Sequence, residues 1–451
     1  MAFSSELIRR IEDGAYDSAL IRLYGRCELP RQRERYTHAL RCFAEYYGPN
    51  RQVRIFSVPG RTELGGNHTD HQNGLALAAA VNLDIIAVAS PSDDGLIRVK
   101  SYGFDKLDVI DLTHRGPRAG ESTHSASLIR GIADEMERRG GRVGGFDAYT
   151  ASDVLRGSGL SSSAAFEVAM GTVLNGLYNG GRFSPLEIAQ IGQYAENTYF
   201  GKPSGLLDPL CCAMGGMLCA DFAQPDAPAI DRLTLDLAPF GYALCVTDTK
   251  GSHSELTPAF AAVRQEMESV ANQFGRAVLR DVPEKDVLLS LASLRQSCGD
   301  RAVLRALHFY AECRRVRQEY ACLEKKDFDG FLALVAESGH SAFEYNQNAF
   351  CTETPRCQPI PIALALSQAI LHGRGAWRLQ GSGFAGTIQA FVPQDLLESY
   401  RDAMEQVFGP GSCLVLTVRA EGGIELTENP APGQAARRAA QPERSHVHVG
   451  V

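Results

Sequence analysis

The sequence lacks several patterns that would each indicate a class of protein. None of its twelve cysteines forms a CxxC pair, and several lie in apolar segments, so we expect reduced thiols rather than disulfides or zinc ligands. No uninterrupted apolar run is long enough to span a bilayer, and residues 1–14 contain no apolar core of a secretion signal. These absences predict a cytoplasmic protein without a membrane partner.

Positive charge is also scarce. The chain has 45 lysines and arginines against 53 aspartates and glutamates, a net charge of −8, which argues against a nucleic-acid partner. With 451 residues and 44 % hydrophobic content, it is long enough for two or three domains with separate cores. Oligomeric state has no readable signal in the sequence, so monomer and homodimer both stay open.

Hydrophobic spacing predicts mixed helices and strands without regular βαβ alternation, which is typical of an α+β protein with two lobes. We expect a strand from Val53 that ends at Pro59-Gly60, and a buried strand pair over 75–90 with a turn near Asn82. A capping box at Ser184–Glu187 predicts a helix start. The expected segments are an N-terminal helical part (1–50), two lobes (51–220 and 221–428) and a disordered tail (429–451).

A glycine- and serine-rich run over 155–165, LRGSGLSSSAA, precedes an expected helix over 161–178. The exposed N–H groups and positive dipole end of a helix start attract phosphate. The chain contains no GxxxxGK[ST], so this run is not a P-loop. By itself it is equally consistent with a loop that caps an ordinary helix.

A second segment, PGRTELGGNHTDHQNG over 59–74, brings Arg61, Asn67, His68 and Asp70 into one glycine-rich turn. Such side chains either satisfy their own backbone in a polar loop or converge on the hydroxyls of a sugar. A metal site is disfavoured, because there is no HExxH motif and no third ligand nearby.

Two further segments carry candidate residues. Asp208 lies among apolar residues after Gly205, and a buried carboxylate must find a partner or become neutral. It is therefore a satisfied core residue, a helix cap, or a functional carboxylate beside Arg61. In WRLQGSGFAGTIQAFV, three glycines indicate either a hairpin or bulge, or a close approach between backbones; they are Gly381, Gly383 and Gly386.

Together these segments resemble the GHMP kinase superfamily, and the galactokinase family in particular, over residues 50–420. The galactokinase signature GRxNxIGEHTDYxxG is matched at most positions of 60–74, and the motif GxGLSSSA is matched in full by 157–164. A third motif, GGGFGG, appears at 381–386 as GSGFAG. Glu196 lies twelve residues before Asp208, the spacing that the family has between a glutamate and its catalytic aspartate.

The resemblance implies a GHMP kinase fold, with the active site in the cleft between two lobes, and phosphoryl transfer from ATP to the anomeric hydroxyl of a sugar. Asp208 would orient or deprotonate that hydroxyl, Arg61 would keep Asp208 ionised, and Mg²⁺ would be held by Ser163 and Glu196. The ATP phosphates would contact Gly157, Ser158, Gly159, Leu160, Ser161, Ser162 and Ser163. The sugar would contact Asn67, His68, Asp70, Gly205 and Phe260.

The sequence departs from the galactokinase pattern at positions that recognise the sugar. Asn67 stands where the family has a glutamate that binds a sugar hydroxyl, and the other departures are His71, Ser204, Pro209 and Phe260. Exchanging a carboxylate for an amide adds a donor and removes a charge, which can change specificity. Three hypotheses follow: a galactokinase, a GHMP kinase for another hexose, an N-acetylhexosamine or a uronic acid, and a non-catalytic sugar sensor.

Overall fold

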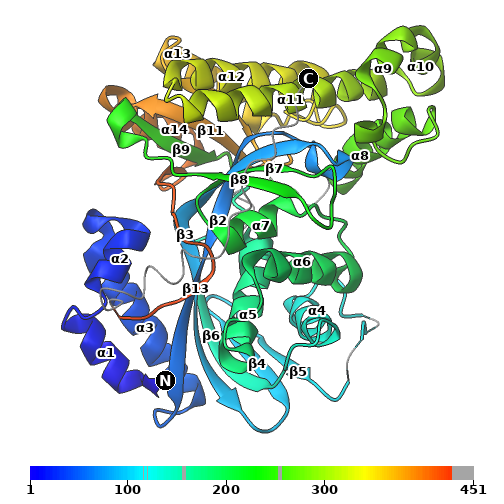
Figure 1. Ribbon diagram of the computed structural model, residues 1–451. Coiled ribbons are helices and arrows are strands. Elements are labelled where there is room, and N and C mark those ends of the chain that lie inside the picture. The colour runs from blue at the N-terminus through cyan, green and yellow to red at the C-terminus, as the bar shows by residue number, and fades with distance from the viewer. Residues whose placement is uncertain (115, 119, 155–158, 252–255, 429–451) are drawn as a thin grey trace.

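The computed structural model describes residues 1–114, 116–118, 120–154, 159–251 and 256–428. Within them, strands form one large and one small sheet (Figure 1). The large sheet has the order β1-β2-β3-β6-β4-β5, with β13 paired to β2, β7 paired to β3, and β8 paired to β7. Its strands are β1 (Ala2–Phe3), β2 (Gln52–Gly65), β3 (Leu75–Ser92), β4 (Leu96–Ser101), β5 (Leu107–Asp111), β6 (Gly145–Ser152), β7 (Met217–Asp221), β8 (Ala229–Leu233) and β13 (Ile424–Glu425).

Helices cover both faces of this sheet (Figure 1). One face packs against three N-terminal helices, whose core includes Ile55 and Val88 of the sheet; they are α1 (Ser4–Glu12), α2 (Asp17–Tyr24) and α3 (Leu29–Tyr47). The opposite face carries α4 (Ser125–Arg138), α5 (Ser162–Asn179), α6 (Pro185–Ala195) and α7 (Leu207–Met214). The helices that follow the glycine–serine run and precede Asp208 are therefore anchored on one layer.

The small sheet has the order β10-β11-β9-β12 and lies beyond the upper end of β2 (Figure 1). Its strands are β9 (Tyr242–Asp248), β10 (Ala376–Gln380), β11 (Thr387–Pro393) and β12 (Cys413–Leu416). The accompanying helices are α8 (Thr257–Asn272), α9 (Glu284–Leu289), α10 (Leu291–Ser297), α11 (Asp300–Glu324), α12 (Phe328–Ser341), α13 (Pro359–Leu371) and α14 (Leu397–Phe408). Because α11 packs against both α12 and β3, it joins the small sheet to the large one.

Two strand predictions were wrong. β2 continues through Pro59-Gly60 to Gly65, with a register shift between Pro59 and Arg61 that accommodates the proline without ending the strand. β3 is one unbroken strand rather than a pair. Asn82 does not turn the chain, because its backbone N–H donates to Thr417 O and its Oδ1 accepts from Thr417 N.

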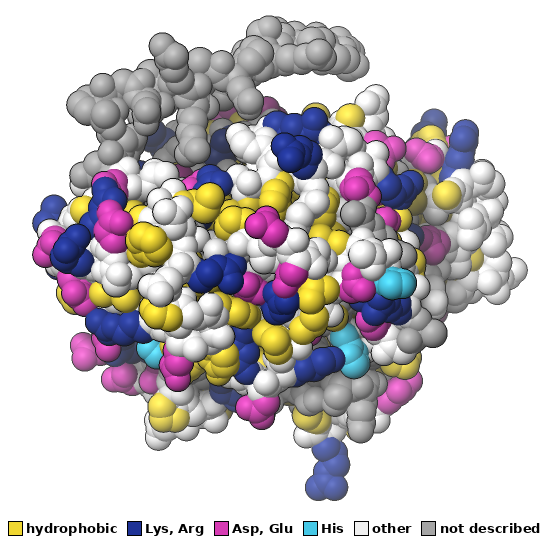
Figure 2. Space-filling view, turned by 90° about the horizontal axis from the view of Figure 1, so that it is seen from below, with side chains coloured by type: hydrophobic (Ala, Val, Ile, Leu, Met, Phe, Trp, Pro, Cys, Tyr) yellow, Lys and Arg dark blue, Asp and Glu magenta, His cyan; other side chains and the backbone are white. Residues whose placement is uncertain are grey.

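The α+β class is confirmed, whereas the lobe boundary at 220/221 stays a prediction and the expected tail over 429–451 lies outside the described residues. No helix in the described part of the chain is both long and apolar enough to cross a membrane. On the face seen in Figure 2, acidic and basic side chains alternate without a large area of one sign.

The capping box that the sequence predicted is present. Ser184 Oγ accepts from Glu187 N at 3.3 Å, and Glu187 Oε2 accepts from Ser184 N at 2.8 Å. Replacing Ser184 by alanine should therefore lower the free energy of unfolding by about 1 kcal/mol. Ser290 also occupies an N-cap, that of α10, but its side chain makes no capping bond. In urea unfolding, Ser290→Ala should change stability much less, and equal effects would contradict this account.

Candidate active site

An ion pair between Arg61 and Asp208 joins the sugar motif to the segment after Gly205. Arg61 Nε donates to Asp208 Oδ1 at 2.6 Å, and Arg61 Nη2 donates to Asp208 Oδ2. The Arg61 side chain is 8 % exposed and that of Asp208 is 34 % exposed, so only the carboxylate is open to a substrate. Burial raises the pKa of Asp208, but Arg61 and a hydroxyl donor outweigh it and hold the pKa below its usual value. Asp208 is therefore ionised at neutral pH.

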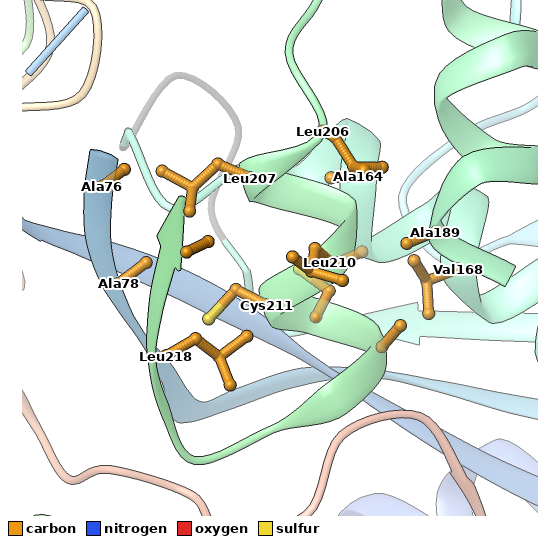
Figure 3. Packing of buried hydrophobic residues seen from close by; sticks show 14 of the residues in the cluster. Ala76, Ala78, Ala164, Val168, Ala189, Leu206, Leu207, Leu210, Cys211 and Leu218 are labelled. Carbon is orange, nitrogen blue, oxygen red and sulfur yellow. The ribbon is translucent and has the colours of Figure 1, made fainter. Parts of the chain in front are cut away.

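Helix α7 presents Asp208 at its first turn. Both Leu210 and Cys211 of α7 are buried: Leu210 lies on the side of Ala164 and Val168 of α5, whereas Cys211 points toward Ala78 of β3 and Leu218 of β7 (Figure 3). The sequence patterns of 195–216 did not predict this helix. Its N-cap makes no side-chain bond, so the fully buried Leu210, more than capping, keeps α7 in place.

The described part of the glycine–serine run touches the ion pair directly. Ser161 Oγ donates to Asp208 Oδ2 at 2.8 Å, and Arg61 Nη1 donates to Gly159 O. Gly159 has a φ of +67°, and a Cβ there would lie 2.4 Å from Thr387 Oγ1, so only glycine fits. Leu160 is fully buried, while Ser162 and Ser163 open α5 and keep partial exposure. The predicted contacts at Gly157 and Ser158 lie outside the described residues.

Glu196 is nearly buried at the point where α6 gives way to a π-helical turn, η3 (Glu196–Phe200). Its Oε1 accepts from Lys202 Nζ at 3.0 Å. No cluster of three acidic, histidine or cysteine side chains suited to a metal was found in the described part of the chain. A site of Ser163 and Glu196 would supply one hydroxyl and one carboxylate. These hard oxygen donors suit Mg²⁺, provided that phosphates and water supply the other ligands.

The turn after β2 brings Asp70 against Gly205. A Cβ on Gly205 would lie 1.8 Å from Asp70 Oδ2, so the absence of a side chain at 205 admits this carboxylate. Burial, and then the charge of Asp208, raise the pKa of Asp70 to about 6. His68 bonds to Ser382 O and to His71 through its two ring nitrogens, and burial lowers the pKa of His68 to about 4.

Phe260 of α8 lies beside the glycine-rich segment, with its ring centroid 5.3 Å from that of Phe384 in an edge-to-face contact. Helix α8 also packs against η2 (Asp70–Gln72). Phe260 therefore belongs to a helix that packs against the turn of Asp70, although it comes from a distant part of the sequence.

We expected the side chain of Asn67 to be available to a sugar, but the structure places it in the interior. It is fully buried, and its amide is bonded to Glu63, Gly381 and Asn348. The physical reason is that β2 runs on to Gly65, which places Asn67 beneath the turn rather than on its surface.

Sequence reasoning missed three features of the site: the contact of Ser161 with Asp208, the pairing of Lys202 with Glu196, and Glu167. Both carboxylate oxygens of Glu167 are buried and have no hydrogen-bond partner within the described part of the chain. Burial, followed by the charge of Glu196, raises its pKa well above the usual value. The only available signal was an isolated glutamate among the apolar residues that follow Ser161–Ser163 in the expected helix.

Known proteins resemble this chain along most of its length. Residues 127–216 match the family model of the GHMP kinases N terminal domain, and residues 41–91 match the galactokinase galactose-binding signature. A galactokinase of Streptomyces coelicolor is 31 % identical over 374 residues, which cover 81 % of this chain and 91 % of that protein. A galactokinase of Glaesserella parasuis is 30 % identical over 364 residues, covering 80 % of this chain and 90 % of that protein.

Solved structures share the fold at lower identity. The crystal structure of Lactococcus lactis galactokinase complexed with galactose has a TM-score of 0.73 at 22 % identity and covers 86 % of this chain and 98 % of that one. The mevalonate kinase of Methanococcus jannaschii has a TM-score of 0.56 at 13 % identity, covering 82 % of this chain and 99 % of that one.

A buried carboxylate behind the sugar motif makes stability depend on pH. Both oxygens of Glu319 lack a hydrogen-bond partner among the residues that the structure describes, and burial raises the pKa of Glu319 to about 8. Glu319 therefore stays protonated in the folded state up to about pH 8, whereas in the unfolded chain Glu319 ionises near pH 4.5. Stability is lost as the pH rises from about 4.5 to 8.

Glu319→Gln should remove this loss and stabilise the protein by roughly 1–3 kcal/mol at pH 8, with little effect below pH 4.5. Chemical unfolding of both proteins at several pH values measures this difference in the free energy of unfolding. Glu312 is equally buried but accepts from Ser338 and Gly66 N, so Glu312→Gln should destabilise at pH 8. A Glu319→Gln gain that does not vary with pH would refute the assignment.

Proposed function

The chain belongs to the galactokinase family and has the GHMP kinase fold; from this premise we propose that it phosphorylates the anomeric hydroxyl of galactose with the residues around Asp208. As a member of the family it is an ATP-dependent sugar kinase. The observation that best supports the assignment of residues is the ion pair of Arg61 with Asp208, which Ser161 joins from the glycine–serine run.

In this proposal Asp208 accepts a hydrogen bond from the anomeric hydroxyl and orients its oxygen toward the γ-phosphorus of ATP. The low pKa that Arg61 and Ser161 maintain makes Asp208 a weak base. Its main role is then to hold the nucleophile and to receive the proton as the oxygen–phosphorus bond forms. Positioning and charge suffice, because the transition state of phosphoryl transfer is loose.

The ATP phosphates would lie against 157–163, at the start of α5, whose N-cap makes no side-chain hydrogen bond to its first N–H groups. Ser163 and Glu196 would hold Mg²⁺, which would offset the charge of the phosphates. Lys202, which is bonded to Glu196, adds positive charge on the same side.

The sugar would be held by Asp70 and the backbone at Gly205, with His68 and Phe260 beside it. A second candidate substrate is another hexose, an N-acetylhexosamine or a uronic acid. One observation favours it: the amide of Asn67 is bonded within the protein, so it does not replace the glutamate that binds a sugar hydroxyl in the galactokinase pattern.

A coupled assay of ADP release with Mg·ATP tests the substrate. We expect turnover of galactose to exceed that of glucose, N-acetylgalactosamine and galacturonate, because the catalytic pair and the turn of Asp70 are intact. Greater turnover of another sugar would refute galactose as substrate. Sugar binding without turnover of any sugar would refute the kinase assignment and leave a sensor.

Two substitutions separate the proposed roles. Asp208→Asn should lower kcat by roughly 10²–10⁴-fold with little change in the KM for ATP, because this carboxylate faces the acceptor. Ser163→Ala should instead raise the KM for Mg·ATP. Steady-state kinetics over both substrates distinguishes the two patterns. An unchanged kcat in Asp208→Asn, or an unchanged nucleotide KM in Ser163→Ala, would remove that residue from its role.

A further inference from the structure

The Asn67 amide uses all its hydrogen-bonding capacity within the protein. Its Nδ2 donates to Gly381 O at 2.7 Å and to Glu63 Oε1 at 3.0 Å. Its Oδ1 accepts from Asn348 Nδ2 at 2.9 Å and from Asn346 Nδ2 at 3.3 Å. Two donors and two acceptor sites are what one amide offers, so nothing remains for a sugar hydroxyl.

The backbone of Asn67 is bound as well. Its N–H donates to Glu312 Oε1 at 3.3 Å, and its carbonyl oxygen is bonded to His308 Nε2 at 3.0 Å. Glu312 and His308 both belong to α11 and are fully buried. One residue therefore ties the turn after β2 to α11, to the 346–348 segment and to the glycine-rich segment that begins at Gly381.

The chemistry of the surroundings selects an amide at this position. Glu63 Oε1 and Gly381 O can only accept, while Asn346 and Asn348 present amide donors on the other side. Glu63 Oε1 also accepts from Arg378 Nη2 at 2.6 Å. A carboxylate at 67 would face the Glu63 carboxylate and a carbonyl, so a negative charge at 67 requires that Glu63 lose its own.

The bonds of Asn67 reach both halves of the proposed site. His68 and Asp70 follow it directly in the chain, and Gly381 follows Gln380, whose Nε2 approaches Gly159 O at 3.4 Å. A displacement of Asn67 would therefore move the sugar side and the phosphate side together.

We propose that Asn67 is a positioning residue rather than a sugar ligand: it fixes the turn of His68 and Asp70 to the glycine-rich segment, and it forms with Glu63 an amide–carboxylate pair that can be exchanged only as a pair. This inference rests on the proposed sugar kinase function. It makes Asp70 and the backbone at Gly205, not position 67, the groups that choose the sugar.

The first test compares Asn67→Ala with the wild type by calorimetric binding of galactose and of 2-, 3-, 4- and 6-deoxygalactose. A displaced turn weakens every sugar by the same factor, roughly tenfold. If Asn67 bound one sugar hydroxyl directly, Asn67→Ala would weaken the binding of every sugar except the deoxy sugar that lacks that hydroxyl. A uniform loss is the expected result, and the inference is overturned if one deoxy sugar is insensitive or if galactose affinity does not change.

Asn175 offers a matched control. It is a buried asparagine whose amide bonds to Phe183 N and O, on α5 and away from the proposed sugar residues. Asn175→Ala should lower thermal stability and leave the affinity for each sugar unchanged. An equal loss of sugar affinity in Asn175→Ala would overturn a specific role for Asn67.

The second test covers the case that Asn67→Ala does not fold, and it needs no sugar. Asn67→Glu should lower Tm by several degrees, and Glu63→Asn/Asn67→Glu should recover most of that loss. Asn67→Glu/Glu319→Gln removes a different buried carboxylate of the same region. Because Glu319→Gln is itself expected to stabilise the protein, this variant is compared with Glu319→Gln alone, and relative to it the full loss in Tm should remain. No loss in the single variant, or no recovery in the exchanged pair, overturns the inference.

Failure of the proposed function would be seen separately. If the wild-type protein neither binds nor phosphorylates galactose, the function is refuted, while the exchange of 63 and 67 is still decided by Tm. If the wild type turns over galactose and the exchanged pair shows no recovery, only the inference falls.

Discussion

The ion pair of Arg61 and Asp208 is the interaction on which the rest of the site depends. It joins a strand of the large sheet to a helix that begins almost 150 residues later, and the glycine–serine run closes over it through Ser161 and Gly159. An arginine that is 8 % exposed would be costly without a partner, so the pair constrains where α7 can lie. The same constraint leaves the carboxylate ionised and open on one side, which is what an acceptor hydroxyl requires.

Beneath the ion pair, buried polar groups connect the two sheets in addition to the apolar core that they share. Arg378 is fully buried and bonds to Glu63 and to Leu64 O, and Gln389 reaches Thr62. Charges placed so deeply tolerate few substitutions, because each lost partner leaves another group unsatisfied. Departures from a family pattern in such a region are therefore expected to occur in compensating sets. Glu63 and Asn67 form one such set. Gly65 and Glu319 form another, because a Cβ at position 65 would lie 1.9 Å from Glu319 Oε2.

Local signals predicted much of the fold. The capping box began α6 where expected, and the helix expected over 161–178 is present as α5 (Ser162–Asn179). The errors arose where tertiary contacts override local preference. Pro59-Gly60 usually ends a strand, but a register shift in a buried sheet absorbs it, and the polar Asn82 stays in β3 because Thr417 satisfies it. Helices α4, α7 and α14 were missed, since in short helices stability comes from packing that a sequence does not display.

The sequence by itself determined the chemical inventory: a glycine–serine run at a helix start, a carboxylate twelve residues after Glu196, and an arginine in a polar glycine-rich turn. These are local patterns, and local backbone chemistry makes them readable. Only the tertiary structure decided which groups meet. In the structure Ser161 donates to Asp208, Asp70 lies against Gly205, and the amide of Asn67 makes its hydrogen bonds within the protein. The physical reason is that hydrogen-bond partners at Asn67 come from four separate parts of the chain, and no spacing in the sequence reports their convergence.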